Sequence, residues 1–347
     1  MVKRMNSAWL GGWRRALAAP LLLHAALAAA EAEVLIGGQA VIEGVMMRSP
    51  RAYAVAVRRP AGDIAVQRQT LQRLSDRHRY WRWPVLRGLA TLGQAMALGV
   101  KALRFSGDAA LQPELQPAPV AAAPAAAAPE EKRGEISRWG VAASLAASLV
   151  FFIAFYKFLP LLAATGLAHS WTAFRGQILF NLADGVIRVA LFLGFIAGLA
   201  LMPDIRRVYE YHGAEHKVVF NFESGEPVTV ANARRFTRLH PRCGTSFMIV
   251  IMLLAIGAYI FIPMDGFWIK LAIRLALLPL LIGLGYEVIR YTAKHGGSLF
   301  AVLARPGLWL QRITTREPSD DQLECSIRAL EEAMALEQSQ GGQLIIA

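Results

Sequence analysis

Four long apolar runs constrain the fold of this chain more than any other feature of its sequence. They occupy about 139–165, 178–202, 247–263 and 267–289, and the third run is short. An α-helix rises about 1.5 Å per residue, so about 20 apolar residues cross a hydrocarbon core about 30 Å thick. The chain is 55% hydrophobic and 18% charged, whereas about 25% of the residues in soluble domains are charged. The sequence therefore predicts a mainly α-helical, polytopic membrane protein with four transmembrane helices.

The distribution of lysine and arginine predicts which segments face the cytoplasm. Residues 31–138 hold fifteen of these cations, residues 203–246 hold seven, and the tail after residue 289 holds six. The connection between the first two runs holds one, and the connection between the last two holds none. Cytoplasmic loops of membrane proteins carry the excess of lysine and arginine. We therefore expect a multi-pass inner-membrane protein whose N-terminal region, 203–246 loop and 290–347 tail are cytoplasmic. The same asymmetry accounts for the net charge of +12, so nucleic acid is not expected as a partner.

The extension at residues 1–33 has two interpretations. Basic residues precede an apolar run at 16–30 that ends in small residues, which is typical of a signal peptide. A cleaved signal would export the cation-rich region that follows, against the charge rule. The sequence therefore favours an uncleaved, surface-associated extension or a misassigned start.

Residues 34–106 are expected to form a small cytoplasmic unit that contains β-structure. Larger and smaller apolar residues alternate from 53 to 57, and a PAGD turn and a second apolar stretch follow. This period of two predicts a β-hairpin. The stretch at 84–105 predicts an amphipathic helix at the membrane surface, with a span as the weaker option. An Ala/Pro-rich linker follows at 107–138, and the tail at 290–347 is expected to hold another amphipathic helix, in which Cys325 is interpreted as a packing residue.

Six charged residues fall inside the apolar runs. In the predicted orientation five of them lie in the outer half of the membrane, whereas Glu287 lies at the inner end of the fourth run. An unpaired acid in the outer half is costly, so the single acid among the five is expected to pair with a neighbouring cation. Two interpretations stay open: snorkelling side chains with one or two ion pairs, or a polar cavity in the outer leaflet. The five residues are Lys157, Asp184, Arg188, Lys270 and Arg274.

The stretch YHGAEHK places two histidines and a glutamate within five positions. His212 and His216 are four residues apart, so on a helix both imidazoles lie on one face and reach one ion. Glu215 lies beside that face, where it is a candidate general base or ligand. Gly213 weakens the helix prediction, because glycine lowers helix propensity by about 1 kcal/mol relative to alanine. The pattern alone is short enough to arise by chance.

A second candidate ligand pair occurs in HPRCGTSF, immediately before the third apolar run. His240 and Cys243 are separated by two residues in a turn-forming context. The two cysteines of the chain are too few for a disulfide framework, and free thiols fit a reducing compartment. Three imidazoles and one thiolate suit a divalent metal, zinc above all. The alternative is a polar juxtamembrane loop whose histidines bind phosphates or backbone. Arg242 is a candidate for holding an anionic substrate group, or it contacts the membrane surface.

Four stretches of this sequence, in order, resemble a bacterial family of uncharacterised multi-pass membrane proteins, the YqhQ-like family. They are GGQAVIEGVMMRSP, YHGAEHK, HPRCGTSF and PGLWLQRITTREPSDDQLE, and the resemblance runs from about residue 34 to residue 332. The family carries the label of a predicted metal-dependent enzyme without a known reaction. The resemblance therefore implies a metal role for His212, Glu215, His216, His240 and Cys243, and it implies nothing about a substrate.

Three functions are compatible with these features. The first is a metal-dependent hydrolase at the cytoplasmic membrane surface, with Glu215 as the base and membrane lipids as neighbours. The second is a non-enzymatic scaffold in which structural zinc ties the central loop into a surface for a protein partner. The third is a transporter or a regulator of transport, which the charges in the outer half indicate. A catalytic zinc keeps one position open, whereas a structural zinc has four protein ligands.

Overall fold

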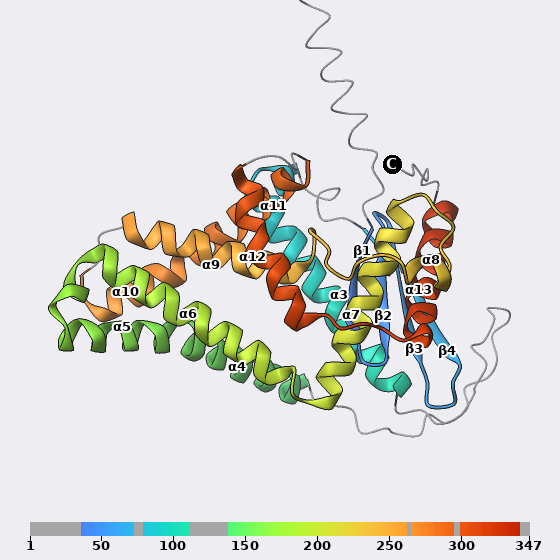
Figure 1. The fold of residues 1–347 in the computed structure, drawn as a ribbon, viewed down its shortest axis with the longest axis horizontal. Coiled ribbons are helices and arrows are strands. Elements are labelled where there is room, and N and C mark those ends of the chain that lie inside the picture. The colour runs from blue at the N-terminus through green and yellow to red at the C-terminus, as the bar shows by residue number, and fades with distance from the viewer. Residues whose placement is uncertain (1–35, 73–78, 111–137, 262–264, 295–298, 341–347) are drawn as a thin grey trace, which may run out of the picture.

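The computed structural model describes residues 36–72, 79–110, 138–261, 265–294 and 299–340 (Figure 1). The extension at 1–33 and residues 111–137 of the expected linker lie outside the described residues. Residues 107–110, which were assigned to that linker, form the last turn of a helix instead. The described part of the chain consists of a small β-sheet covered by helices and a set of long apolar helices beside it.

The sheet is a four-stranded antiparallel meander in the order β1-β2-β3-β4. The predicted hairpin is confirmed as β3 and β4, in which Val55 lies opposite Gln67. A further hairpin of β1 and β2 precedes it, and its turn places Glu43 at φ 52°. The strands comprise β1 (Gly37–Val41), β2 (Gly44–Arg48), β3 (Ala52–Arg58) and β4 (Ile64–Thr70).

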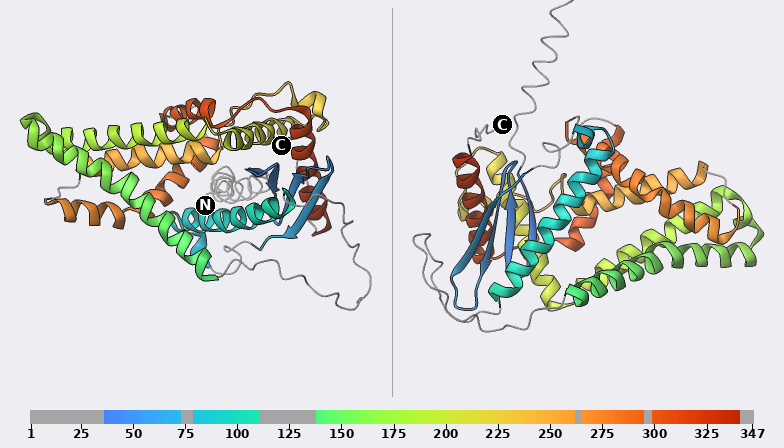
Figure 2. Two further views of the ribbon diagram at one scale, coloured as in Figure 1. Left: turned by 90° about the horizontal axis from the view of Figure 1, so that it is seen from below. Right: turned by 180° about the vertical axis from the view of Figure 1, so that it is seen from behind.

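Helices cover both faces of this sheet, and the alternation of side chains along the strands explains why. One face, which includes Val55 and Val57, packs against Leu98 and Ala102 of α3 (Leu86–Ala110). The opposite face packs against α7 (Pro203–Glu223) and α13 (Asp320–Ser339). Figure 2 shows the sheet between α3 and α7. Since successive residues of a strand point to opposite faces, strands whose residues are apolar on both faces are stable here only as the middle layer.

The predicted helix at 84–105 is therefore present as α3. Part of its apolar surface packs on protein, whereas Met96, Val100 and Leu103 are exposed. Besides the sheet, α3 contacts α11 (Leu278–Lys294). Arg87 of α3 donates to Glu287 of α11 at 2.6 Å. A Cβ atom at Gly88 would lie 2.7 Å from Cβ of Tyr286, so the two helices are in close contact. A location of α3 at the membrane surface stays a prediction.

Three helices in the described residues are long and apolar enough to cross a membrane, or four if one bent pair counts as a single span. They coincide with the four predicted runs. The first three are Ala146–Ser170, Gln177–Leu199 and Gly244–Phe261, and the bent pair is Phe267–Ala276 with Leu278–Thr292, at 45° to each other. The elements that build them are α4 (Arg138–Ile153), the π-helical turn η3 (Ala154–Phe158), α5 (Leu159–Ser170), α6 (Gln177–Leu199), α9 (Gly244–Phe261), α10 (Phe267–Ala276) and α11.

The region at 203–246, predicted as a loop, is largely helical, although the residue types after position 217 alternate as in a strand. α7 continues to Glu223 because Tyr211, Ala214 and Val218 recur at helical spacing and pack into the core against the sheet. A short helix α8 (Val230–Ala233) follows, capped by Thr229. This burial outweighs the local alternation of residue types that indicated a strand.

The tail contains the predicted amphipathic helix, α13, and one more helix that was not predicted. Ser319 and Gln322 form a capping box at the start of α13. α12 (Leu299–Thr314) packs against α9 through a cluster that includes Leu310 and Met252. The C-terminal end of α12 lies beside α7, next to the candidate site. Two short 3-10 helices complete the described elements, η2 (Arg79–Arg82) and η4 (Thr172–Arg175).

Candidate metal centre

The two histidines of YHGAEHK lie on one face of α7, as the four-residue spacing predicts. The ring centroids of His212 and His216 are 4.4 Å apart. The helix runs through this stretch despite Gly213. The helicity on which the sequence argument depended is therefore present in the structure.

The close contact between α7 and the segment that links α12 to α13 explains why position 213 is a glycine. A Cβ atom at this position would lie 2.0 Å from the backbone oxygen of Arg316. The amide of Arg316 also donates to the backbone oxygen of Tyr209 at 2.9 Å. Only glycine allows the chain between α12 and α13 to lie this close to α7, and the same chain supplies a hydrogen-bond acceptor to His212.

Backbone carbonyls orient both imidazoles. Nδ1 of His212 lies 2.8 Å from the oxygen of Thr314, and Nδ1 of His216 lies 2.5 Å from the oxygen of Arg238. A carbonyl only accepts, so each ring carries its proton on Nδ1 and leaves Nε2 with a free lone pair. Backbone carbonyls orient the histidine ligands of metal sites in the same way. Burial lowers the pKa of His216 and so favours its neutral form, which is the form that ligates.

Cys243 completes a group of three potential ligands. Nε2 of His212 lies 3.2 Å from Sγ of Cys243. The ligand atoms of His212, His216 and Cys243 all lie within 4.8 Å of one another, the one such group among the described residues. The donor atoms of a tetrahedral zinc site, with bonds of about 2.0–2.3 Å, lie about 3.3–3.8 Å apart. Small side-chain adjustments would bring the three atoms to these separations.

His240 adjoins this group and is not part of it. Its ring centroid is 5.5 Å from that of His216. Gln311 of α12 fixes its backbone, accepting from the His240 amide at 2.7 Å and donating to its carbonyl at 2.8 Å. Nδ1 of His240 accepts from the amide of Arg242 at 3.3 Å, which places the ring proton on Nε2. That nitrogen is buried without a hydrogen-bond partner among the described residues. Ligation by His240, expected from the sequence, stays a prediction.

Glu215 is buried directly beside the group. Its Oε2 lies 3.5 Å from Nε2 of His216. Burial raises the pKa of this carboxyl, while the neighbouring His212 and His240 and a hydrogen bond from the Gly38 backbone partly oppose that rise. Gly38 of β1 leaves space for it, because a Cβ there would lie 2.5 Å from Cγ of Glu215. A carboxyl with a raised pKa is suited to accept and return a proton near neutral pH.

Arg242 and Glu43, which belong to two of the four stretches named above, are each engaged in an ion pair. Arg242 pairs with Glu223 at the end of α7, and Oε2 of Glu223 lies 3.6 Å from Nε2 of His240. Glu43 of the β1–β2 turn pairs with Arg207. The role of Arg242 toward a substrate stays a prediction. Glu223 lies beside both His240 and Arg242.

Cys325, the second cysteine, packs in the core as predicted. It is fully buried between α13 and the sheet, and its thiol contacts the backbone oxygen of Ala56 at 3.2 Å. Burial raises its pKa to about 12. This thiol is therefore unsuited to metal binding, which requires the thiolate.

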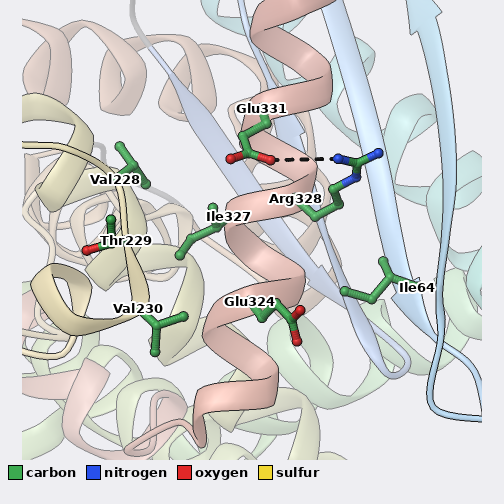
Figure 3. A pocket seen from close by; sticks show the side chains of 8 residues that line it. All are labelled: Ile64, Val228, Thr229, Val230, Glu324, Ile327, Arg328 and Glu331. Carbon is green, nitrogen blue, oxygen red and sulfur yellow. Dashed lines mark ion pairs between the residues drawn. The ribbon is translucent and has the colours of Figure 1, made fainter.

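A separate hollow of about 340 Å³ lies between β4, α13 and the turn before α8. Its wall combines apolar side chains with the ion pair of Arg328 and Glu331, 3.9 Å apart (Figure 3). The hollow shares no residue with the group of three ligands. It holds no set of side chains suited to metal binding.

Comparisons with known proteins identify relatives of this chain but no characterised function. A family model described as a protein of unknown function (DUF1385) matches residues 83–336. An uncharacterised protein of Bacillus subtilis (strain 168), YqhQ, is 34% identical over 303 residues, which is 87% of this chain and 92% of that protein. No solved structure matches.

Proposed function

The chain belongs to the DUF1385 family, and we propose that it is a membrane enzyme with one zinc ion held by His212, His216 and Cys243. One observation carries this proposal. Both histidines donate Nδ1–H to backbone carbonyls, Nε2 of His212 lies 3.2 Å from Sγ of Cys243, and the ligand atoms of His212, His216 and Cys243 lie within 4.8 Å of one another. Backbone acceptors that orient two rings toward one point are the expected surroundings of metal ligands.

Three protein ligands support a catalytic role over a structural one. A zinc ion held this way keeps a fourth position for water, whose pKa it lowers to about 7. Glu215 is placed to accept a proton there as a general base. Nε2–H of His240 makes no hydrogen bond within the described residues, although Oε2 of Glu223 lies 3.6 Å away, and it can stabilise charge on the departing group. The reaction class that fits these groups is hydrolysis.

The site also supports a substrate at the membrane surface. α7 follows the candidate span α6, and Cys243 immediately precedes the candidate span α9. The excess of lysine and arginine in the same region supports a location on the cytoplasmic side of an inner membrane. Arg242 is partly exposed and pairs with Glu223; exchange of this partner would let its guanidinium bind an anionic group such as a lipid phosphate.

Reporter fusions test this topology. A cytoplasmic reporter is expected to be active when fused after Ser224 and when fused at the C-terminus, because both segments belong to cation-rich parts of the chain. A fusion in the connection at 171–176, between α5 and α6, is the matched control and should report the opposite side. Activity of an exported reporter at Ser224 would contradict the proposed placement.

The burial of the site favours a second function, a structural zinc that holds α7, α9 and α12 together. His216 is 2% exposed and Cys243 is 8% exposed, so access for a substrate is narrow. In that case His240 moves in as a fourth ligand and the site is closed. The two functions differ in whether an external ligand can reach the metal.

Cobalt substitution distinguishes these functions. We expect the visible spectrum of the Co²⁺-loaded protein to shift when azide is added, because an open fourth position exchanges water for azide. His240→Ala should retain one Co²⁺ and the same azide response. A spectrum that is insensitive to azide in the wild type and becomes sensitive in His240→Ala would show a closed site, and the enzyme proposal would fail.

A further inference from the structure

Polar side chains from four helical segments meet inside the set of long apolar helices. Asp184 of α6 receives hydrogen bonds from Arg188 of the same helix and from Arg274 of α10, the latter at 2.6 Å. The pairing of Asp184 with cations, predicted from the sequence, is thus confirmed. Arg274 also donates to Asn181 at 2.8 Å. We call the following residues the Asp184 cluster: Lys157, Asn181, Asp184, Arg188, Tyr259 and Arg274.

The Asp184 cluster holds more positive than negative charge. Lys157, Arg188 and Arg274 are at most 5% exposed, and the one acid among them is fully buried. Lys270, the fifth predicted charge, is not counted in the cluster; its ammonium nitrogen lies 3.9 Å from the centroid of the Phe180 ring. Three cations and one acid leave a formal excess of two positive charges. Buried charges in proteins are paired or neutralised, and arginine does not deprotonate. The two guanidinium groups share one carboxylate, so at least one positive charge lacks a counter-ion among the described residues, which favours a bound anion.

Several donors of the cluster are unused. Nε and Nη1 of Arg188 and Nε of Arg274 are buried and have no hydrogen-bond partner among the described residues. Both guanidinium groups lie over the ring of Tyr259, at 5.4 and 4.9 Å from its centroid. Contact with an aromatic ring stabilises the face of a guanidinium. It does not supply acceptors to the N–H groups, which lie in the guanidinium plane.

Two helix irregularities adjoin the cluster. The π-helical turn η3 contains Lys157, and the 45° break between α10 and α11 comes three residues after Arg274. π-helical turns are frequent at functional sites, and broken membrane helices often line binding sites for ions and small solutes. Asp184 is seven residues from the first residue of α6, or about 10 Å along the helix. The cluster therefore lies about two helical turns from that end of α6.

We propose that the Asp184 cluster binds the phosphate group of a doubly charged phosphate, either inorganic phosphate or the headgroup of phosphatidic acid. A phosphate monoester carries a charge of about −1.5 to −2 at pH 7, which matches the formal excess of two. Guanidinium groups are the preferred partners of phosphate oxygens. This site is separate from the proposed zinc centre and does not depend on it.

The full-length protein, delipidated and placed in phosphatidylcholine nanodiscs, provides the test. Inorganic phosphate is titrated at constant ionic strength while the unfolding temperature is followed. We expect a saturable rise, as for any ligand that binds only the folded state. Arg188→Gln should raise the half-saturating concentration about tenfold, the loss expected for one charge-assisted interaction. Arg175→Gln, which alters an exposed arginine outside the cluster, should match the wild type.

A second variant covers the case in which Arg188→Gln does not fold. Asp184→Asn raises the formal excess from two to three, so phosphate should recover the unfolding temperature that this variant loses. A network that serves only packing would give no recovery. The proposal would be overturned if the wild type shows no saturable response to inorganic phosphate or to phosphatidic acid. It would also be overturned if Arg188→Gln leaves the response unchanged and phosphate gives no recovery in Asp184→Asn.

Nanodiscs that contain phosphatidic acid identify the source of the phosphate. A rise in unfolding temperature with phosphatidic acid and none with inorganic phosphate assigns the site to a lipid headgroup. A rise with inorganic phosphate alone assigns it to a solute. Either result supports a phosphate site, provided that Arg188→Gln weakens the response.

Discussion

Replacing Gly213 with alanine is expected to destabilise the protein by about 3 kcal/mol or more and to impair zinc binding. The added Cβ would lie 2.0 Å from the backbone oxygen of Arg316. A backbone atom cannot move away by changing a rotamer, so the whole segment after α12 must shift, and overpacking of this kind costs about 1–3 kcal/mol or more. The same shift moves the carbonyl of Thr314 away from His212. Denaturant unfolding and zinc titration measure the two effects.

Gly93→Ala is the matched control for this substitution. Gly93 lies in α3, and a Cβ there would meet nothing within 4 Å. Alanine in an open helix position stabilises by about 0.5–1 kcal/mol relative to glycine. Equal effects of the two substitutions would show that the close approach of α7 and the Arg316 backbone is absent.

Replacing His216 with alanine is expected to weaken zinc binding by at least about 100-fold. Loss of a residue that only orients a ligand costs about 10–100-fold, and loss of a ligand itself should cost at least the upper end of this range. Competition with a chromophoric chelator measures the affinity. Cys243→Ser and His212→Ala should behave alike, because their donor atoms belong to the same group of three.

Two substitutions elsewhere serve as controls for this measurement. His169→Ala removes an exposed histidine at the end of α5, and Cys325→Ser changes the buried thiol on α13. Both should retain the wild-type zinc affinity per folded chain. If His216→Ala also retained it, α7 would not supply the metal ligands.

Much of the architecture was predictable from residue patterns. The four apolar runs correspond to the candidate spans, and the alternation around Val55 corresponds to the β3–β4 hairpin. The patterns did not predict α12 or the continuation of α7 to Glu223. Both depend on contacts between segments far apart in the chain: Leu310 of α12 packs into a cluster with α9, and Val218 of α7 packs against the sheet. Local alternation does not report such contacts.

The sequence predicted the candidate ligands but not the groups that orient them. The spacing of His212 and His216 indicated a shared helix face. The groups that orient them are the carbonyls of Thr314 and Arg238, and a backbone carbonyl has no signature in the sequence because every residue has one. Gln311, which fixes the backbone of His240, lies in one of the stretches that carried the family resemblance. Gly213 weakened the helix prediction, yet it is the residue that allows the carbonyl of Thr314 to approach.

X-ray absorption at the zinc edge of the zinc-loaded, full-length protein tests the central claim most directly. The proposed centre predicts one zinc per chain with one sulfur at about 2.3 Å, two imidazole nitrogens at about 2.0–2.1 Å and one further light atom from water. His240→Ala should leave this set unchanged, whereas Cys243→Ser should remove the sulfur shell. Failure to bind zinc, or a coordination shell without sulfur, would contradict the assignment of His212, His216 and Cys243 as the metal site.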